Sequence, residues 1–174
     1  FQGRPADVTG RLEKEIAVYD LLDQLDIPFR RVDHDHADTM EMCQEIDQAL
    51  GQDICKNLFL CNRQKTKFYL LLMPGSKPFK TKDLSAQIGS SRLSFGGPED
   101  MERLLHLTPG SVTVLGLMYD PDCQVTLLID QDLYQQTAFG CHPCINTSTV
   151  QFSTADLREK LLPALGHPVT LVQL

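Results

Sequence analysis

Lys56 is the residue of this sequence best placed to do charge-based chemistry. It lies within the strand-like run 54–61, whose apolar residues are expected to be buried. A lysine at the end of a core strand presents a point charge to a carbonyl or phosphate oxygen. The same pattern also fits an outward-facing lysine whose stem packs on apolar neighbours while its ammonium group reaches water. The pattern alone leaves both interpretations open.

The run Cys141-His142-Pro143-Cys144 has the spacing of thiol redox sites, but its context does not favour one. A redox CxxC needs its first cysteine at a helix N-terminus, whereas the residues after Cys144 continue into a β-branched strand. Zinc requires four ligands, and no second CxxC or histidine pair has ligand spacing. His142 precedes a proline in a turn, so it is either a surface histidine or a site residue.

Other common catalytic signatures have no counterpart in the sequence. There is no GxSxG, HExxH or Walker pattern, so nucleophilic serine chemistry and the usual metal or nucleotide sites lack support. The pairs Gly96-Gly97 and Gly110-Ser111 indicate turns, because no phosphate-loop context surrounds them.

Length and composition predict one globular domain. The 174 residues are 42% hydrophobic and 22% charged, and a chain of this size buries about 68 to 70% of its unfolded surface, so its core needs no metal or disulfide. Residues 1–3 are expected to be the remnant of an expression tag and residues 4–174 the domain. No apolar run approaches the roughly 18 to 20 residues that span a bilayer. The six scattered cysteines are expected to be reduced thiols in the cytoplasm.

The net charge of -7 is unevenly distributed along the chain. Between Lys56 and Arg92 there are eight basic residues and one acidic residue, Asp83, which gives +7 for this stretch and -14 for the rest. Such a split indicates either one cationic face for a polyanion or a solvated basic face with no partner.

Periodicity and turn signals predict interleaved helices and strands. Helices are expected over 11–25, from 38 to 50, from a cap at Thr81 to 88, over 98–105, and from a cap at Ser153 or Thr154 to 165. Strands are expected over 29–33, 54–61, 67–73, 111–117, 125–129 and 147–152, with Leu70 to Leu72 in a central strand. Hairpin-like neighbours favour an α/β (α+β) domain with a mixed, mostly antiparallel sheet or a partly closed barrel surrounded by helices.

Five ordered blocks resemble the prolyl-tRNA editing domains, the YbaK/ProX-like aminoacyl-tRNA deacylases. They are Lys56-Asn57-Leu58-Phe59-Leu60, the run 84–89 (LSAQIG), the run 92–95 (RLSF), the run 107–112 (LTPGSV), and His142-Pro143 followed by Asn146-Thr147. The resemblance covers about residues 13–165 and is greatest to the freestanding alanyl-tRNA(Pro) deacylases. It implies hydrolysis of the ester between alanine and tRNA(Pro), with no cofactor, while Pro-tRNA(Pro) is spared by a double sieve.

The resemblance also implies roles for particular residues. Lys56 would bind aminoacyl or phosphate oxygens, the backbone of Gly110 to Gly116, including Ser111, would hold the ester carbonyl, and His142 would lie beside the pocket. Asn57, Val112, Val114, Gly116 and Asn146 would contact the substrate. Water would attack with help from the ribose 2′-hydroxyl, since the motifs hold no strong protein base.

The partners implied are the acceptor end of alanine-charged tRNA(Pro) and, as a further candidate, prolyl-tRNA synthetase. Lys80, Lys82 and Arg92 are the expected tRNA contacts. Many relatives carry a proline in the loop where this chain reads 111–116, so Val114 bears on the amino-acid preference. The alternatives are a Cys-tRNA(Pro) or relaxed-specificity deacylase and a non-catalytic tRNA-binding or regulatory module.

Overall fold

The computed structural model describes residues 3–7, 9–34, 56–75, 77–108, 111–145 and 147–174. In chain order its elements are α1 (Glu13–Gln24), β1 (Arg30–Asp33), β2 (Lys56–Cys61), β3 (Phe68–Met73), α3 (Thr81–Ile88), β4 (Ser94–Phe95), α4 (Pro98–Leu105), the 3-10 helix η1 (Val114–Tyr119), β5 (Val125–Asp130), α5 (Gln131–Tyr134), β6 (Ala138–Cys141), β7 (Ser148–Ser153), α6 (Thr154–Asp156), the π-helix η2 (Leu157–Leu161), α7 (Leu162–Leu165) and β8 (Val169–Val172). The helix expected over 38–50 lies outside the described residues.

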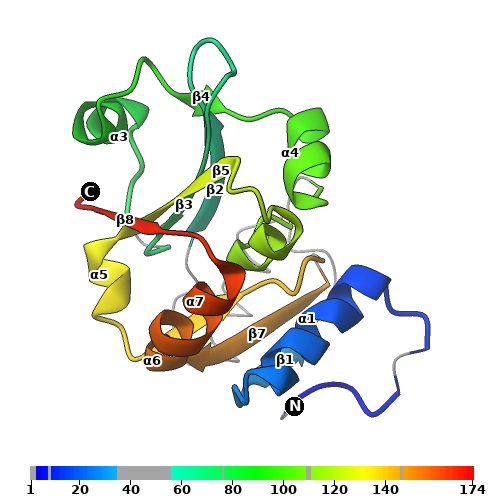
Figure 1. The fold of residues 1–174 in the computed structure, drawn as a ribbon. Helices are drawn as coiled ribbons and strands as arrows, with labels where there is room; N and C mark the ends of the chain where they lie inside the picture. The colour runs from blue at the N-terminus through cyan, green and yellow to red at the C-terminus, as the bar shows by residue number, and fades with distance from the viewer. Residues whose placement is uncertain (1–2, 8, 35–55, 76, 109–110, 146) are drawn as a thin grey trace.

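The strands form two sheets, and the mixed α/β class is confirmed. One sheet has the order β1-β7-β6 and is antiparallel, and the other has the order β4-β2-β3-β5-β8. In the larger sheet β2 pairs antiparallel with β3 and β4, whereas β5 runs parallel to both β3 and β8. Figure 1 shows the two sheets at opposite ends of the molecule, with α1 packed across the smaller one. Neither sheet closes into a barrel in the part of the chain described.

Two hydrophobic cores explain this arrangement. The larger one lies between the sheets and joins α1 (Val18, Tyr19), β7 (Phe152) and the larger sheet (Phe59, Leu70). The smaller one lies under α3, where Leu84 of the helix packs with residues of the larger sheet such as Leu60 and Leu71. β3 is buried along its whole length because both of its faces are covered, which confirms the expected central strand.

Most expected elements are confirmed, and two expectations are wrong. Thr81 does not cap α3, since the helix begins there and Lys80 holds the cap position without a side-chain bond. The run 111–117 is not a strand: the Thr113 side chain accepts a hydrogen bond from the amide of Leu115 and starts η1. The β-branched residues of this run predicted a strand, whereas the Thr113 side chain caps a helical turn instead.

Buried polar groups hold the start of β5. Asp120 accepts hydrogen bonds from the amides of Gln124 (3.0 Å) and Val125 (2.8 Å), and its Oδ2 lies 3.1 Å from His167 Nε2. His167 Nδ1 lies 3.0 Å from the carbonyl oxygen of Leu165. The contacts of His167 tie the segment before β8 to the start of β5.

Candidate active site

Lys56 is the first residue of β2 and lies at the end of the larger sheet. Its Nζ donates to the carbonyl oxygen of Lys77 at 2.5 Å. Lys77 is itself paired with Asp130 (3.0 Å) and Asp132 (2.5 Å), so these carboxylates are already engaged. Among the described residues no carboxylate forms an ion pair with Lys56. The carbonyl contact therefore orients the ammonium group, and no carboxylate in the described part of the chain pairs with it.

Strand alternation places Lys56 and Asn57 on opposite faces of the sheet. Lys56 shares a face with Leu58 and Leu60, which pack in the core under α3. Asn57 shares its face with Phe59, which packs in the larger core. Two site residues that are adjacent in the sequence thus approach the end of the sheet from different sides.

The loop that leads into η1 is held by its own polar groups. Ser111 is almost fully buried, and its hydroxyl donates to the carbonyl oxygen of Thr108 at 2.8 Å. The amides of Ser111, Leu115 and Gly116 donate within the loop. No hydrogen bond from the amides of Val112 or Thr113 is seen within the described residues. Thr113 is fully buried and Val112 is partly buried, and Gly110 lies outside the described residues.

Val114 and Gly116 have a packing role in the structure. Val114 is fully buried in the larger core. A Cβ placed on Gly116 would come within 2.7 Å of Leu107 Cδ1, so this glycine allows η1 to lie against the segment after α4. Val112 is partly buried and packs on the same core.

His142 follows β6, and its hydrogen bond fixes its tautomer. Nδ1 lies 2.9 Å from the carbonyl oxygen of Ser148, and since a carbonyl only accepts, Nδ1 carries the proton. Burial lowers the pKa of His142, and the neighbouring His34, at 6.1 Å between ring centroids, lowers it further. The ring is therefore neutral near pH 7, and its Nε2 is an acceptor.

A charged network supports the strand that holds His142. The Ser148 hydroxyl lies 2.9 Å from Asp33 Oδ1, and Oδ2 of Asp33 pairs with Arg31 and with Arg11 (3.2 Å). Burial opposes ionisation of Asp33, but the hydrogen bonds from Arg31 and Arg11 prevail and lower its pKa to about 2. The sequence did not single out His34, Asp33 and Ser148. No sequence pattern distinguishes a polar residue that supports a site residue from one that faces solvent.

The thiols beside His142 do not form a redox site. Cys141 and Cys144 are free and buried, and burial raises the pKa of Cys144 to about 12. A reactive thiol needs the opposite shift. Within the described parts of the chain, no group of three His, Cys, Asp or Glu side chains could hold a metal ion.

The expected tRNA contacts lie around α3 and β4. Lys80 precedes α3, Lys82 lies in its first turn, and Arg92 lies in the loop before β4; all three are exposed. In the described chain no hydrogen bond or ion pair joins Lys56, Ser111 and His142 to one another. Asn146 lies outside the described residues.

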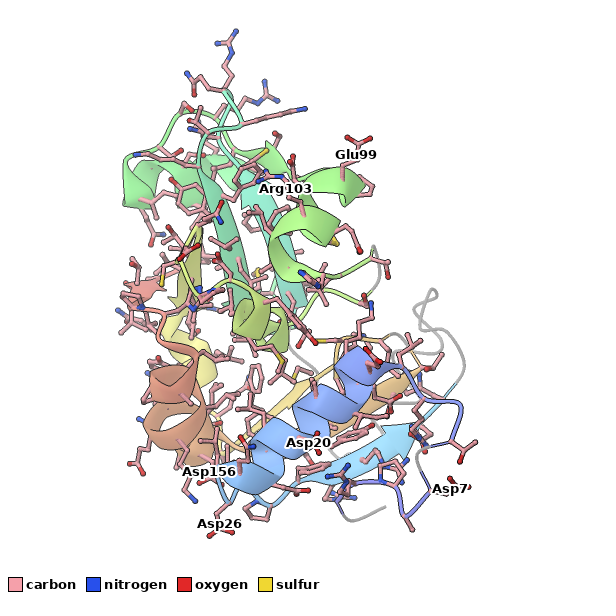
Figure 2. The ribbon with its side chains drawn as sticks, turned by 45° about the vertical axis from the view of Figure 1, so that its right-hand side comes forward. Asp7, Asp20, Asp26, Glu99, Arg103 and Asp156 are labelled. Atoms are coloured by element: carbon pink, nitrogen blue, oxygen red, sulfur yellow. The ribbon has the colours of Figure 1, made fainter. Side chains whose placement is uncertain are left out.

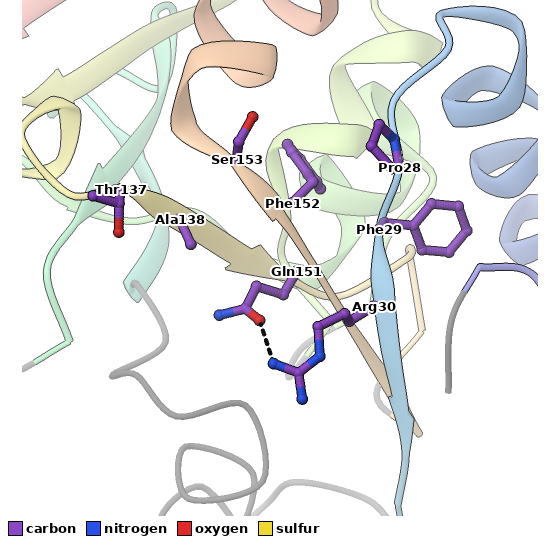
Figure 3. Close-up of a pocket in the computed structure, with 8 residues that line it drawn as sticks. All are labelled: Pro28, Phe29, Arg30, Thr137, Ala138, Gln151, Phe152 and Ser153. Carbon is purple, nitrogen blue, oxygen red and sulfur yellow. Dashed lines mark hydrogen bonds between the residues drawn. The ribbon is translucent and has the colours of Figure 1, made fainter.

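A cavity of about 280 Å³ lies elsewhere, against the smaller sheet (Figure 3). It is lined by residues of β1, β6 and β7, among them Arg30 and Gln151, which are joined by a hydrogen bond of 3.3 Å. None of the site residues expected from the sequence lines this cavity. No helix in the described part of the chain is long and apolar enough to cross a membrane.

Comparison with known proteins gives one consistent family. The aminoacyl-tRNA editing domain matches residues 34–160. The chain is 31% identical to the prolyl-tRNA editing protein ProX of Acetoanaerobium sticklandii, over 94% of this chain and 99% of that protein. It is 28% identical to the prolyl-tRNA synthetase associated domain-containing protein 1 of Danio rerio, over 96% of this chain and 88% of that protein.

Solved structures show the same fold. A crystal structure described as a candidate trans-editing enzyme for prolyl-tRNA synthetase superposes with a TM-score of 0.66 at 17% identity, covering 94% of this chain and 98% of that one. The sequence blocks, the family match and this shared fold lead to one conclusion. The chain belongs to the aminoacyl-tRNA editing domain family.

Proposed function

We propose that this protein hydrolyses the ester of Ala-tRNA(Pro) and spares Pro-tRNA(Pro). Its family membership makes it an aminoacyl-tRNA deacylase that acts on mischarged tRNA(Pro). The alanine preference is the finer part of the proposal, and it rests on the resemblance to the alanine-clearing branch.

The reaction needs placement more than strong acids or bases, because the aminoacyl ester is already reactive. The oxygen of a water molecule attacks the ester carbonyl carbon, the bond from that carbon to the ribose oxygen breaks, and the ribose oxygen takes up a proton. Free alanine and tRNA leave. The substrate's 2′-hydroxyl helps to position the water and to carry its proton.

Each part of the site has one task in this scheme. Lys56 binds carbonyl or phosphate oxygens and orients the ester. The backbone amides of the loop 110–116, that of Val112 among them, donate to the carbonyl oxygen as it becomes negative. His142 offers Nε2 as an acceptor to the ribose hydroxyl or the water, while Asn57 and Asn146 are the candidates to bind the amino group.

The observation that carries the proposal is that, among the described residues of a chain of this family, Lys56 forms no ion pair. Its Nζ donates to the carbonyl oxygen of Lys77, whose own ammonium group is the one that pairs with Asp130 and Asp132. An ion-paired lysine would offer much less charge to an anionic or carbonyl group.

The experiment compares deacylation of tRNA(Pro) charged with Ala, Cys, Ser or Pro under single-turnover conditions. The proposal expects Ala-tRNA(Pro) to be cleaved at least about 10-fold faster than the others, since a small pocket discriminates by roughly 1 to 3 kcal/mol. Faster cleavage of Cys-tRNA(Pro), or equal rates for Ala, Cys and Ser, would favour the alternative specificities. Retained tRNA binding without any cleavage would indicate a binding module.

A prolyl-tRNA synthetase is the second proposed partner. The support is the name of the Danio rerio relative, a synthetase-associated domain protein. Co-sedimentation of the purified chain with prolyl-tRNA synthetase, with and without tRNA(Pro), tests this association.

A further inference from the structure

Phe95 is an exposed aromatic residue three positions after the basic stretch 56–92. Its side chain is 63% exposed, which is the highest value among the exposed large hydrophobic residues of the described chain. It lies on β4, the edge strand of the larger sheet, directly opposite Leu60 of β2. Phe79 packs against it edge to face, with 6.3 Å between ring centroids. We call Phe79 and Phe95 the aromatic pair.

The aromatic pair lies on the same face of the sheet as Lys56. Leu60 and Lys56 are four residues apart on β2 and so point to the same side, and Phe95 points there too because it is paired directly with Leu60. Four strand residues span about 13 Å at roughly 3.3 Å each. The segment between β3 and α3 links the two places, since the Lys77 carbonyl binds Lys56 and Phe79, two residues later, packs on Phe95.

Exposed cations lie on the segments next to those that carry the aromatic pair. The amide of Arg63 donates to the Ser91 hydroxyl at 3.3 Å, which places the β2–β3 loop beside the loop before β4. Asn62 shapes this loop by accepting hydrogen bonds from the amides of Thr66 (2.9 Å) and Lys67 (3.2 Å). The exposed basic residues on these segments and at the start of α3 are Arg63, Lys65, Lys67, Lys80, Lys82 and Arg92.

These charges are available for an anionic partner. None of the six residues forms an ion pair within the described chain. Figure 1 shows β4 and the β2–β3 loop next to α3, and Figure 2 shows Asp7, Asp20, Asp26 and Asp156 at the opposite end of the molecule, whereas Glu99 lies at the same end as β4. These four aspartates are therefore separated from the exposed cations in space as well as in sequence.

We infer that the aromatic pair is a stacking platform for an unpaired base of the tRNA 3′ end, with Phe95 as the residue that contacts the base. An exposed aromatic ring within a row of cations is the arrangement by which proteins bind single-stranded nucleic acid, as bases stack on the ring and phosphates contact the cations. This inference rests on the proposed function for the identity of the nucleic acid. It adds a contact that holds the single-stranded end on the path to Lys56.

The test measures binding of uncharged tRNA(Pro) with an intact 3′ end and of the same tRNA without its single-stranded 3′ end. Phe95→Ala should weaken binding of the intact tRNA about 5- to 100-fold and leave binding of the truncated tRNA unchanged. The matched control is Leu171→Ala, which removes an exposed apolar side chain from the opposite edge strand, β8. It should change neither affinity.

Phe95→Trp supplies a direct readout, because the chain contains no tryptophan. Its fluorescence should be quenched by a single-stranded oligonucleotide that ends in the tRNA 3′ sequence, and affinity for intact tRNA should stay within about 3-fold of wild type. Wild-type affinity of Phe95→Ala, or an equal loss with both tRNAs, would overturn the inference.

Other occupants of the platform would give different results. If the wild-type chain dimerises in sedimentation experiments and Phe95→Ala abolishes the dimer without changing tRNA affinity, then a second copy covers the platform and the inference is wrong. Failure of the proposed function has a separate signature, which is absent deacylation with the Phe95-dependent binding intact.

Discussion

At the scale of single residues, His142 shows how a backbone contact can prepare a side chain for chemistry. The Ser148 carbonyl binds the Nδ1 proton, and burial keeps the ring neutral, so Nε2 is available as an acceptor. Neither effect can be predicted from the sequence, in which His142 was either a surface histidine or a site residue. The resemblance selected the residue, while the structure supplies its protonation.

His142 predicts the acid limb of the pH profile. Because its pKa is lowered from 6.5, the ring becomes protonated only at a more acidic pH, and kcat/KM should stay constant near neutrality and fall below a midpoint under 6.5. His34→Ala removes a neighbour that lowers this pKa, so it should move the midpoint to higher pH. A profile of kcat/KM from pH 4.5 to 8 checks both. An identical limb in His142→Ala would assign it to another group.

Asp33 predicts a pH-dependent contribution to stability. Its folded pKa of about 2 lies below the ordinary value of 3.8, so its stabilising effect is complete above 3.8 and is lost as pH falls toward 2. Asp33→Asn should reduce the free energy of unfolding by roughly 1 to 2 kcal/mol at pH 7, after allowance for solvent screening, and by less at pH 3.

The matched control for this change is Asp20→Asn. Asp20 pairs with Arg4 on the surface, where both side chains are well exposed. Such a pair contributes about 1 kcal/mol or less. Urea denaturation of wild type and the two variants at pH 3 and 7 measures the free energy of unfolding. Equal losses in both variants would show that the Asp33 network stabilises the protein no more than an exposed ion pair does.

At the scale of elements, the sequence predicted what local pattern determines. The helix α3 and the strands β2, β3 and β5 follow from periodicity and turn residues, and all lie where expected. The strands β6 and β8 were missed, because each has four residues and is defined by its partners, β7 and β5. The 3-10 helix η1 replaced an expected strand because the Thr113 side chain caps its start and Gly116 leaves room for it beside Leu107.

The candidate site was predictable only through the resemblance. The sequence pattern alone did not decide whether Lys56 is a surface lysine or a site residue. The structure adds the contact with the Lys77 carbonyl oxygen that holds its side chain. The support from Asp33 to Ser148 joins residues 115 positions apart, which no local pattern encodes.

Gly96 predicts a packing limit at the end of β4. A Cβ there would lie 2.3 Å from two ring carbons of Phe59, which is buried and stacked on Phe68, so Gly96→Ala should cost about 1 to 3 kcal/mol. Gly97→Ala is the matched control, since nothing lies within 4 Å of its Cβ position. It occupies the cap position of α4 and should cost less than about 1 kcal/mol. Thermal unfolding of both variants decides, and equal Tm values would contradict the packing account.

At the scale of the whole molecule, the uneven charge predicts which end of the protein binds tRNA. The net charge is -7, yet residues 56–92 carry +7 and lie mainly at the end with β4 and α3 (Figure 2). A negative body repels non-specific polyanions, whereas the basic end attracts phosphates. The sequence predicted this asymmetry, and the structure adds that the exposed cations are not paired among the described residues.

Charge reversal tests whether tRNA binds at this end of the molecule. Replacing Lys80, Lys82 and Arg92 by glutamate should weaken tRNA binding and reduce the slope of log Kd against log salt by up to about 0.9 for each lost phosphate contact. Reversing Arg4, Arg158 and Lys160 makes the same change in net charge at the other end and should have a small effect on that slope. Equal effects of the two triple variants would mean that net charge alone steers the tRNA.

The most direct test of the whole account is single-turnover hydrolysis of Ala-tRNA(Pro) by wild type and Lys56→Ala, with the protein in saturating excess and Lys160→Ala as a control for loss of a lysine. The account predicts rapid release of alanine by wild type and Lys160→Ala, no release of proline from Pro-tRNA(Pro), and a rate at least about 100-fold lower for Lys56→Ala. Hydrolysis by Lys56→Ala at the wild-type rate would contradict the role given to this lysine.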